Sequence, residues 1–524
     1  MTGRHPSLRH EPSSLIGGQW LAHTPDAGVP LVSRNPARPA EVIWSGRSDA
    51  ASVGAATASA RIARREWASW PLQRRAAVLE RFKRLCEARA EQVAQLIGDE
   101  TGKVLWDART EAAALAAKVD ITLDQSARAP IQRVTDFELN LGATRTGRCS
   151  FRPHGVMAVV GPFNFPAHLP NGHIVPALAM GNTIVFKPSD KAPAVGQLLG
   201  ELLQEALDAE GAPAGVVNVI QGGADVARAL VTNSDIDGVL FTGSWPVGRA
   251  IMQSNLDRPG LMLALEMGGN NAAVVLPDAD LKQAAIECAR CAFITTGQRC
   301  TCTRRLIVHR EIADRFIKAL CKAASNLIVG DPRAAHPVFM GPIISKTARE
   351  AVLAFQSRAT HAGAELLVQG SELDSPGAGW FLTPSILLVD GFRIAPRDPG
   401  RFDPGADEEV FGPLLRMSIV DSYDSAIEQA NATQFGLAAS LFTRDTSAAA
   451  RFLAEARAGC ININTGTAGA SSKLPFGGLG HSGNHRPAGA FSLDYCAYPV
   501  AAMIESGPAA QVSPGMRFED SWLG

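Results

Sequence analysis

The pattern of apolar and polar residues between positions 50 and 125 predicts consecutive amphipathic helices. From Leu79 to Ile97, apolar residues recur at steps of three and four, which places them on one face of an otherwise charged helix. Gly102 follows this pattern, where a glycine can close a helix in the left-handed conformation. We expect a further helix from about residue 104 to 125, and short strands with turns over residues 15–48.

From residue 155 the pattern changes to short apolar runs separated by helical stretches. The runs GVMAVVG, NTIVFKPS, VVNVIQG, GVLFTGS and LMLALEMGG lie between residues 155 and 269, and a second series runs from NAAVVLP at residue 271 to CININT. Such alternation is typical of doubly wound parallel sheets, in which ligands bind at the carboxyl ends of the strands. We therefore predict an α/β fold with two doubly wound parallel-sheet lobes.

Three segments outside these runs have other patterns. Residues 130–154 alternate as a polar-rich ribbon of strands, which needs a partner strand elsewhere, in this chain or on another subunit. Residues 392–409 are rich in Pro, Gly and charge and predict an exposed loop. After residue 485, FSLDYCAYPV predicts another strand, and residues 507–524 predict a polar tail.

Length, charge and cysteine usage narrow the class of protein. A single core rarely grows past roughly 250–300 residues, so a chain of 524 residues is expected to form two large lobes. The formal net charge of −1 offers no basic excess for nucleic acid, and no apolar run approaches the roughly 20 residues of a membrane span. The N-terminus lacks a signal-peptide core and the nine cysteines show no secreted disulfide pattern, so we expect a cytoplasmic protein with reduced thiols.

The candidate chemistry is concentrated between Leu265 and Cys302. Glu266 stands beside two glycines in LEMGGNN, and Cys300 lies in the polar loop GQRCTC. A thiolate can attack a carbonyl carbon, and a nearby carboxylate can later take a proton from water. Asn164, in PFNFP, could donate a hydrogen bond to a developing oxyanion, or be a simple turn residue. The set indicates covalent catalysis at a carbonyl.

Signals for a nucleotide cofactor are weaker, because GxGxxG follows none of the predicted strands. In GSWPVG, residues 243–248, the start of a helix could receive a pyrophosphate, the alternative being an ordinary strand-to-helix turn. Lys187 and Asp190 in FKPSD could hold the hydroxyls of an adenosine ribose, or form a solvated loop with a helix cap. An acid at that ribose would repel a 2′-phosphate, which favours NAD over NADP.

Seven motifs occur in order over almost the whole chain: GPFNFP, FKPS, FTGS, LEMGG, GQRC, EEVFGP and PFGG. In this order they resemble the aldehyde dehydrogenase superfamily. The 34-residue interval from Glu266 to Cys300 also matches the spacing of base and nucleophile in that family. The resemblance implies an aldehyde dehydrogenase-like fold, NAD as cofactor and no metal.

The resemblance also implies roles for individual residues. Cys300 would attack the aldehyde, Asn164 and the Cys300 backbone N–H would hold the oxyanion, and Glu266 would activate the water that releases the acid from a thioester. Lys187 and Asp190 would bind the adenosine ribose, although the family usually has Glu at the latter position. The pyrophosphate would lie along Gly243, Ser244, Trp245, Pro246, Val247 and Gly248, the nicotinamide ribose against Glu409, and its ring against Phe411.

The domain organisation implied by the resemblance has four parts. Residues 1–129 and 155–266 would form the NAD-binding domain, residues 267–485 the catalytic domain, residues 130–154 and 486–506 the oligomerisation strands, and residues 507–524 a C-terminal tail. Members of the family assemble as homodimers or homotetramers, which is the assembly we expect.

A finer resemblance concerns the substrate. NGHIVPAL, GQRCTC, SGNHRP and DYCAYPV are similar to the branch of the family that oxidises N-succinylglutamate 5-semialdehyde in arginine degradation by the succinyltransferase route. This acidic aldehyde carries two carboxylates, so cations or polar donors should line its pocket. The candidates are His173, Arg299, His485 and Arg486, each of which could equally be a structural residue. The loop at 464–470 lacks the lysine and proline usual in that branch, so another acidic semialdehyde is an alternative.

Other classes of function fit less of the sequence. A cysteine hydrolase or acyl transferase without a redox cofactor would use Cys300 and Glu266 but leave FKPSD, TGSWPVG and EEVFGP unexplained. A CoA-acylating dehydrogenase is disfavoured because the water-activating Glu266 is present. Cys288 and Cys291 with the pair 300 and 302 resemble a zinc site, but the first two lie in an alanine-rich helical pattern. Cys302 could regulate Cys300 under oxidation or pack inward.

Overall fold

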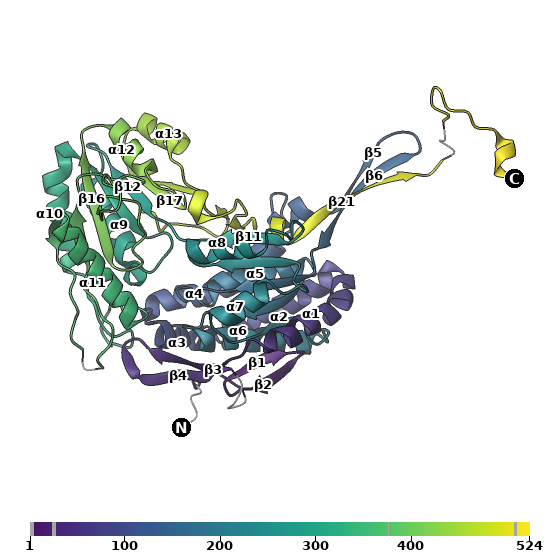
Figure 1. Cartoon of the computed structure of the whole chain (residues 1–524), viewed down its shortest axis with the longest axis horizontal. Helices are drawn as coiled ribbons and strands as arrows, with labels where there is room; N and C mark the ends of the chain where they lie inside the picture. The colour runs from purple at the N-terminus through teal and green to yellow at the C-terminus, as the bar shows by residue number, and fades with distance from the viewer. Residues whose placement is uncertain (1–4, 24–27, 376, 508–510) are drawn as a thin grey trace.

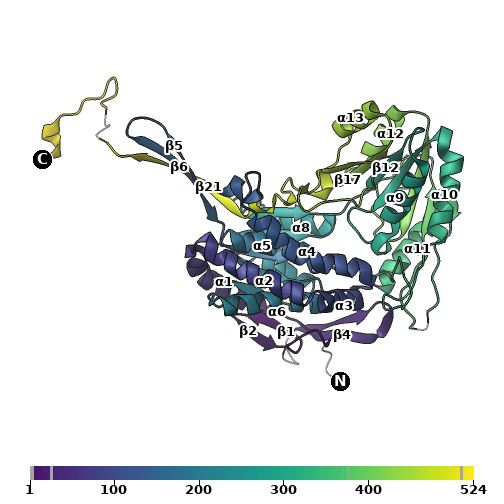
Figure 2. The ribbon, with the colours of Figure 1, turned by 180° about the vertical axis from the view of Figure 1, so that it is seen from behind.

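The computed structural model describes residues 5–23, 28–375, 377–507 and 511–524, so the first four residues and residues 508–510 of the predicted tail lie outside the described residues. Two lobes stand side by side, and a long β-ribbon projects from one of them (Figure 1). The view from behind places the C-terminus beyond the far end of this ribbon (Figure 2). Each lobe is built on a seven-stranded, mostly parallel sheet, which confirms the predicted α/β class.

The first sheet consists of β1 (Ser13–Ile16), β2 (Gln19–Ala22), β7 (Val156–Val160), β8 (Thr183–Lys187), β9 (Val217–Val219), β10 (Gly238–Thr242) and β11 (Met262–Glu266). Its order is β11-β10-β7-β8-β9-β1-β2. The chain proceeds from β7 toward β9 on one side and places β10 and β11 on the other. The order therefore reverses between β7 and β10, which is where ligands bind in open α/β sheets. The antiparallel hairpin β1–β2 extends the edge of this sheet beside β9. The sequence pattern predicted short strands in this region but not that they join the sheet.

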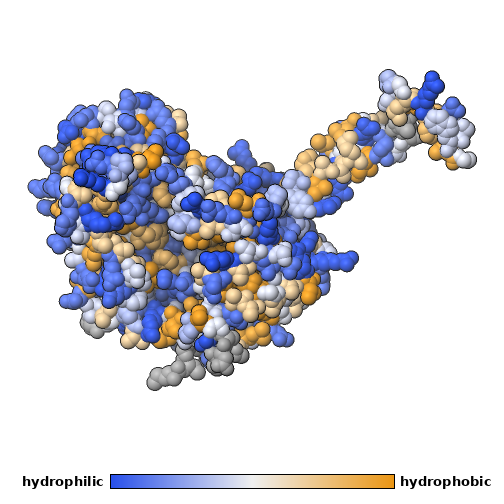
Figure 3. Space-filling view, viewed as in Figure 1, coloured by the Kyte–Doolittle hydropathy of each residue, from blue (hydrophilic) through white to orange (hydrophobic). Residues whose placement is uncertain are grey.

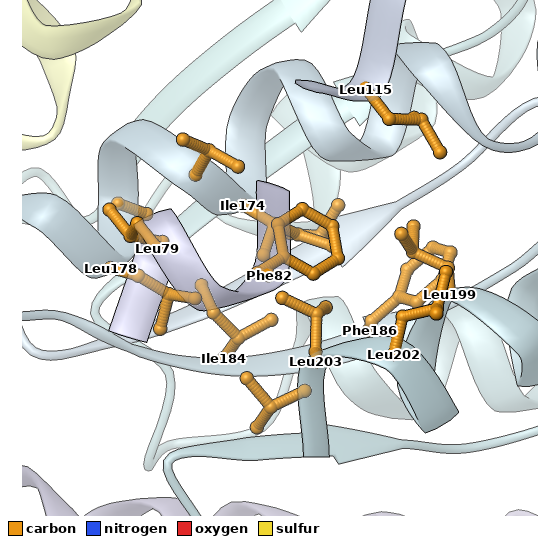
Figure 4. Close-up of a cluster of buried hydrophobic side chains, with 14 of the residues drawn as sticks. Leu79, Phe82, Leu115, Ile174, Leu178, Ile184, Phe186, Leu199, Leu202 and Leu203 are labelled. Carbon is orange, nitrogen blue, oxygen red and sulfur yellow. The ribbon is translucent and has the colours of Figure 1, made fainter. Parts of the chain in front are cut away.

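Helices enclose this sheet and bury its apolar strands. They are α1 (Ser52–Ser69), α2 (Leu72–Ala88), α3 (Ala90–Thr101), α4 (Leu105–Leu123), α5 (His168–Ala179), α6 (Pro193–Ala209), α7 (Ala224–Val231) and α8 (Trp245–Ser254). In the core, Phe82 of α2 and Leu115 of α4 meet side chains of α6 and Phe186 of β8 (Figure 4). Strands buried on both faces explain why their sequences read as continuous apolar runs.

The apolar stripe from Leu79 to Ile97 belongs to two helices, where the sequence pattern predicted one. The backbone leaves the helical region at Arg89, with φ −112° and ψ 15°, and its guanidinium donates to the Ser7 carbonyl. Leu79 and Ile97, at the two ends of the stripe, are both fully buried. The spacing of buried apolar residues therefore continues across the break between α2 and α3. Gly102 ends α3 in the left-handed conformation, with φ 76°, as predicted.

The second sheet consists of β12 (Asn271–Val275), β13 (Thr303–His309), β14 (Glu365–Val368), β15 (Ser385–Leu388), β16 (Leu414–Val420), β17 (Ala438–Phe442) and β18 (Cys460–Ile463), in the order β14-β15-β16-β13-β12-β17-β18. Its helices are α9 (Leu281–Phe293), α10 (Ala313–Ser325), α11 (Lys346–His361), α12 (Tyr423–Asn431) and α13 (Thr446–Glu455). The chain passes from one sheet to the other between β11 and β12. The domain division predicted above remains a proposal.

The projecting ribbon is formed by β5 (Phe137–Asn140), β6 (Arg145–Pro153) and β21 (Ala497–Glu505), and β6 pairs with β21 over its whole length. Residues 130–134 form a short 3₁₀ helix, so the ribbon begins later than predicted. The last strand also begins later, because buried Leu493 and Tyr495 lie in a 3₁₀ turn ahead of it. Apolar residues gather on the ribbon in the space-filling view (Figure 3). Phe137 and Leu139 of β5 and Met503 of β21 are exposed apolar residues of this ribbon.

The remaining strands form small pairs, β3 (Val29–Asn35) with β4 (Arg38–Ser48) and β19 (Pro475–Phe476) with β20 (Ala488–Gly489). The segment 392–409 contains neither a helix nor a strand, and residues 394–401 are exposed, as predicted. Its far end folds inward, because the Asp403 carboxylate binds the Arg393 guanidinium and the Gly405 backbone. Among the described residues, no helix is long and apolar enough to cross a membrane.

Candidate active site

Two adjoining cavities open where the strand order of the first sheet reverses. The smaller has a volume of about 180 Å³ and contains Glu266 in its wall. The larger has a volume of about 490 Å³, runs past the carboxyl ends of β7, β8 and β10, and contains Asn164 in its wall. Cys300 lines both cavities. The structure thus brings the three predicted catalytic residues to the junction of two cavities.

The Cys300 loop is held by an unusual backbone. Thr295 and Thr296 have positive φ angles of 53° and 56°, and Gly297 follows with φ 69°. A Cβ on Gly297 would lie 2.1 Å from the Gly412 carbonyl oxygen, so this turn requires glycine. After the turn, the Asn271 side-chain amide donates to the Cys300 carbonyl at 2.7 Å and fixes the loop on β12.

The Cys300 thiol is poorly ionised in this environment. Burial raises its pKa to about 12, and the Glu266 and Glu409 carboxylates contribute in the same direction. Attack on a carbonyl needs the thiolate, so a base must take the proton or a cation must arrive beside the sulfur. The neighbouring Cys302 is fully buried, and its Sγ faces the Ile294 carbonyl at 3.8 Å.

Glu266 has the features of a general base. It ends β11, is 5% exposed, and its Oε2 has no hydrogen-bond partner among the described residues. The Ala488 backbone N–H donates to the same carboxyl group, but burial dominates and raises its pKa well above the ordinary value of glutamate. An unpaired buried carboxyl with a raised pKa can accept a proton from a thiol or from water.

Asn164 is 7% exposed and lies in the loop after β7. Its side-chain amide nitrogen donates to the Gln298 carbonyl at 2.8 Å, two residues before Cys300. This bond holds the amide against the nucleophile loop and leaves its second N–H available to donate to an oxyanion.

The larger cavity contains most of the predicted cofactor residues: Lys187, Asp190, Gly243, Ser244, Val247, Glu409 and Phe411. The buried Lys187 ammonium donates to the carbonyls of Pro188 and Gly222 at 2.6 and 2.7 Å, and burial lowers its pKa to about 8. Asp190 is exposed at the rim. The Glu409 carboxylate accepts from the Gly269 N–H at 3.1 Å, and the Phe411 ring meets Phe163 edge to face at 5.9 Å.

The start of α8 borders the same cavity and suits a pyrophosphate. Ser244 is the N-cap residue, and a Cβ on Gly243 would lie 2.4 Å from the Phe241 ring, so the packing of this turn requires glycine. The unpaired backbone N–H groups at a helix start can bind a phosphate. Three predicted residues do not line the cavity. Trp245 stacks on His481 at 3.9 Å, Pro246 occupies the first turn of α8, and Gly248 packs under Met267. The residues present therefore fit a dinucleotide.

The predicted substrate residues divide into two pairs. His173 and Arg299 line the smaller cavity, whereas His485 and Arg486 are exposed and do not line it. Both ring nitrogens of His173 are engaged, by the Tyr495 hydroxyl at 2.8 Å and the Thr242 hydroxyl at 3.2 Å. Burial lowers the pKa of His173 to about 3.

The SGNHRP segment holds the wall of the cavity through its backbone and Asn484. The Asn484 side chain accepts from the Leu265 N–H and donates to the Leu263 carbonyl, each at 2.9 Å, beside Glu266. The segment then delivers Ala488 and Gly489 to the cavity. Its neighbour in the wall is the 464–472 segment, through Ala468, Ala470, Ser471 and Ser472.

Sequence reasoning missed two ionisable residues of the smaller cavity, Lys118 and His168. Lys118 lies on the buried face of α4 with Leu115, Val119 and Thr122. A lysine at three- and four-residue steps from apolar positions was the signal that could have drawn attention to it. His168, the first residue of α5, follows PFNFP closely but gives no such signal.

Cys288 and Cys291 are buried in α9, where Cys288 belongs to the core beside β12 and β13 and Cys291 packs against Gly466. Among the described residues, no group of three or more His, Cys, Asp or Glu side chains is arranged to hold a metal ion.

Comparison with known proteins gives three findings. A model described as the aldehyde dehydrogenase family matches residues 23–499. N-succinylglutamate 5-semialdehyde dehydrogenase of Paraburkholderia xenovorans is 44% identical, covering 96% of this chain and 99% of the relative, and N-succinylglutamate 5-semialdehyde dehydrogenase 1 of Caulobacter vibrioides is also 44% identical, covering 93% and 98%. The crystal structure of an NAD-dependent aldehyde dehydrogenase from Sinorhizobium meliloti has a TM-score of 0.87 at 28% identity, covering 97% of both chains.

Proposed function

The chain belongs to the aldehyde dehydrogenase family, and we propose that it oxidises N-succinylglutamate 5-semialdehyde to N-succinylglutamate, with NAD as hydride acceptor, in arginine degradation by the succinyltransferase route. The observation that carries the reaction is the position of Cys300, which lines both the cavity of Glu266 and the cavity of Lys187 and Glu409. A thiol at this junction can meet an aldehyde from one side and a nicotinamide from the other. Support for the substrate comes from the two bacterial relatives at 44% identity.

The first step is attack of the Cys300 sulfur on the aldehyde carbon. Glu266, with its unpartnered Oε2, takes the thiol proton, and a C–S bond forms as the carbonyl π electrons move to oxygen. The Asn164 amide and the Cys300 backbone N–H donate to that oxyanion. In a comparable site, one such donor contributes about 10²–10³ in rate.

The second step removes hydride from the same carbon and leaves a thioester on Cys300. The chemistry that bound NAD supplies is acceptance of this hydride. Glu266 first releases the proton that it took from the thiol to solvent, and then, as the carboxylate, takes a proton from water. The water oxygen attacks the thioester carbonyl, and the C–S bond breaks to return the Cys300 thiolate. The products are the carboxylic acid and reduced cofactor.

The proposed cofactor contacts follow the walls of the larger cavity. Lys187 and Asp190 bind the adenosine ribose, and the carboxylate of Asp190 favours NAD by repelling a 2′-phosphate. The start of α8, from Gly243 to Gly248, receives the pyrophosphate, with Trp245 and Pro246 shaping the turn behind it. Glu409 binds the nicotinamide ribose and Phe411 supports the ring.

A substrate panel tests this function. The value of kcat/KM is measured for N-succinylglutamate semialdehyde, glutamate semialdehyde, succinate semialdehyde and a neutral aliphatic aldehyde, each with NAD and NADP. We expect the first substrate with NAD to have the highest value by at least about tenfold, equivalent to roughly 1.4 kcal/mol of transition-state binding. A preference for the neutral aldehyde would contradict the proposal, as would CoA-dependent product formation.

A second candidate substrate is another acidic semialdehyde. The observation that favours it is the loop 464–470, which lacks the lysine and proline usual in the branch and contributes Ala468 and Ala470 to the wall of the smaller cavity. In the same panel, a higher kcat/KM for glutamate semialdehyde or succinate semialdehyde would select this alternative without changing the reaction.

We also propose that the β5–β6–β21 ribbon joins subunits into a homodimer or homotetramer. Phe137, Leu139 and Met503 are each at least half exposed on it, which is unusual for a ribbon in solution and is typical of a surface that a second subunit covers. Replacing all three with Asp should produce monomers in light scattering, whereas unchanged assembly would contradict the proposal.

A further inference from the structure

We propose that Lys118, His168 and the free edge of Arg299 form a carboxylate-binding subsite in the wall of the smaller cavity. All three residues line this cavity together with Cys300. The subsite determines specificity by holding a carboxylate of the acidic aldehyde while its carbonyl carbon lies at the sulfur. This inference rests on the proposed function, because it assigns residues to the recognition of that substrate class.

Lys118 is a buried cation without an acidic partner. It is 3% exposed, and its ammonium donates to the Gly489 carbonyl at 2.7 Å and to the Ser492 hydroxyl at 3.0 Å. Among the described residues it makes no ion pair, whereas buried Lys103 nearby is paired with Glu111. Two neutral acceptors leave the third ammonium N–H uncommitted. A charge kept in a cavity wall without a counterion is an expected feature of an anion-binding site.

His168 lines the same wall, and one of its ring nitrogens is unpaired among the described residues. Its Nδ1 is inaccessible and has no hydrogen-bond partner among the described residues. Burial lowers the His168 pKa to about 4, and the nearby positive charges of Lys118, Lys103 and Arg299 act in the same direction. The imidazole is therefore neutral at pH 7 and can donate one hydrogen bond.

Arg299 is oriented by two fixed acceptors. Its Nε donates to the Thr295 hydroxyl at 2.8 Å and its Nη2 to the Asp107 carboxylate at 2.6 Å, while Nη1 has no partner among the described residues. The side chain is 15% exposed and lies over the Phe165 ring at 5.0 Å. A guanidinium held at one edge presents its other edge with little loss of side-chain entropy on binding.

Apart from Glu266, whose raised pKa favours its uncharged form, the acidic groups around this wall leave one positive charge without an acidic partner. Asp107 is committed to Arg299, and Glu111 is committed to Lys103 and to the backbone N–H groups of Ala167 and His168 at the start of α5. Lys118 remains as the excess cation. A substrate carboxylate placed between Lys118 and Nη1 of Arg299 would neutralise the Lys118 charge and accept charge-assisted hydrogen bonds from both side chains.

The test is the ratio of kcat/KM for N-succinylglutamate semialdehyde to that for a neutral aliphatic aldehyde. Replacing Lys118 with Met removes the charge at similar volume, and we expect the ratio to fall about 10–100-fold, as for the loss of a charge-assisted hydrogen bond. Lys118→Arg should recover part of the ratio. Lys282→Met, which removes an exposed lysine of α9, is the matched control and should leave it unchanged.

His168→Phe gives an independent measurement if the Lys118 variants fold poorly, and it should lower the ratio by about 5–10-fold because one neutral hydrogen bond is lost. Equal losses for both aldehydes in the Lys118→Met and His168→Phe variants would overturn the subsite. The ratio in the unmodified enzyme tests the proposed function separately. If the wild-type enzyme prefers the neutral aldehyde, the proposed function is wrong. If the wild-type enzyme prefers the acidic aldehyde and both variants keep that preference, the function stands and only the proposed subsite is wrong.

Discussion

Burial raises the pKa of the Cys300 thiol, and the Glu266 carboxyl raises it further, although both groups line the same small cavity in which a thiolate is needed. Neither side chain makes an ion pair among the described residues, and Oε2 of Glu266 has no partner at all. Negative charge on both groups together is therefore unfavourable, whereas one shared proton suits the pair. This relationship favours a proton transfer from sulfur to carboxyl as the aldehyde is attacked.

Replacing Cys300 with Ala should abolish dehydrogenase activity, because no other thiol lines both cavities. We expect a loss of at least about 10⁴-fold in kcat, the scale for removal of a nucleophile. Formation of NADH from aldehyde and NAD is the measurement. Activity at the wild-type rate in this variant would remove Cys300 from the mechanism, while wild-type activity in Cys302→Ser is the expected control result.

Glu266→Gln should separate the two halves of the reaction. Release of the thioester depends on a base, so steady-state kcat should fall by about 10²–10⁴-fold. Hydride transfer precedes that step but follows the thiol deprotonation that also uses Glu266, so rapid mixing should reveal a burst of up to one NADH per subunit that is itself slower than in the parent enzyme. A variant that turns over steadily at the parent rate would show that another group activates the water.

The pH dependence follows from the raised pKa of Glu266. The carboxylate, not the carboxylic acid, accepts the proton from water, so the active fraction of enzyme increases as pH rises through the elevated pKa. We therefore expect kcat under conditions where thioester release is limiting to rise with pH above the ordinary range of a glutamate. The same rise should be absent from the residual activity of Glu266→Gln. A flat profile in the unmodified enzyme would contradict the assignment.

Lys187 should control cofactor affinity and leave aldehyde recognition unchanged. Its ammonium borders the larger cavity but not the smaller one. We expect Lys187→Met to raise KM for NAD by about tenfold or more, the value for one charge-assisted hydrogen bond, with little change in KM for the aldehyde. Lys191→Met is the matched control, since Lys191 is exposed in the same loop and does not line the larger cavity. A parallel change in both Michaelis constants would instead indicate a general structural effect.

The sequence predicted those parts of the site that lie at the ends of strands. Asn164, Lys187, Gly243 and Glu266 follow β7, β8, β10 and β11 closely or end them, so the apolar runs and the doubly wound pattern already place them at one edge of a sheet. Lys118 could not be placed in this way. Its contact with the cavity depends on how α4 packs against α5 and the Ala488–Gly489 strand, which local periodicity does not encode.

The break at Arg89 has a similar origin. The stripe from Leu79 to Ile97 keeps its period through both helices, so the pattern alone cannot reveal the change in direction. The Arg89 guanidinium binds the Ser7 carbonyl, a contact between residues far apart in the sequence. The exposed positions of His485 and Arg486 likewise depend on the turn that brings Ala488 toward Glu266, where His485 adopts φ 62°.

The buried pair of Lys103 and Glu111 should be a strong determinant of stability at this site. Both side chains are almost completely buried, and the Glu111 carboxylate also accepts from the backbone N–H groups of Ala167 and His168 at 3.0 and 3.1 Å. Glu111→Ala leaves the Lys103 charge without a counterion and the start of α5 without acceptors. We expect a loss of about 3–5 kcal/mol in the free energy of unfolding, as for other broken buried pairs.

Denaturant unfolding of Glu111→Ala, compared with Glu91→Ala, checks this expectation. Glu91 forms an exposed ion pair with Arg109, so its removal should change stability little. The double variant Lys103→Met with Glu111→Leu should recover much of the loss, because it replaces two buried charges with apolar volume. If Glu111→Ala were no less stable than Glu91→Ala, the pair would contribute no net stabilisation. The position of His168 at the start of α5 would then have to depend on its packing against Phe165, where the two rings meet edge to face at 6.3 Å.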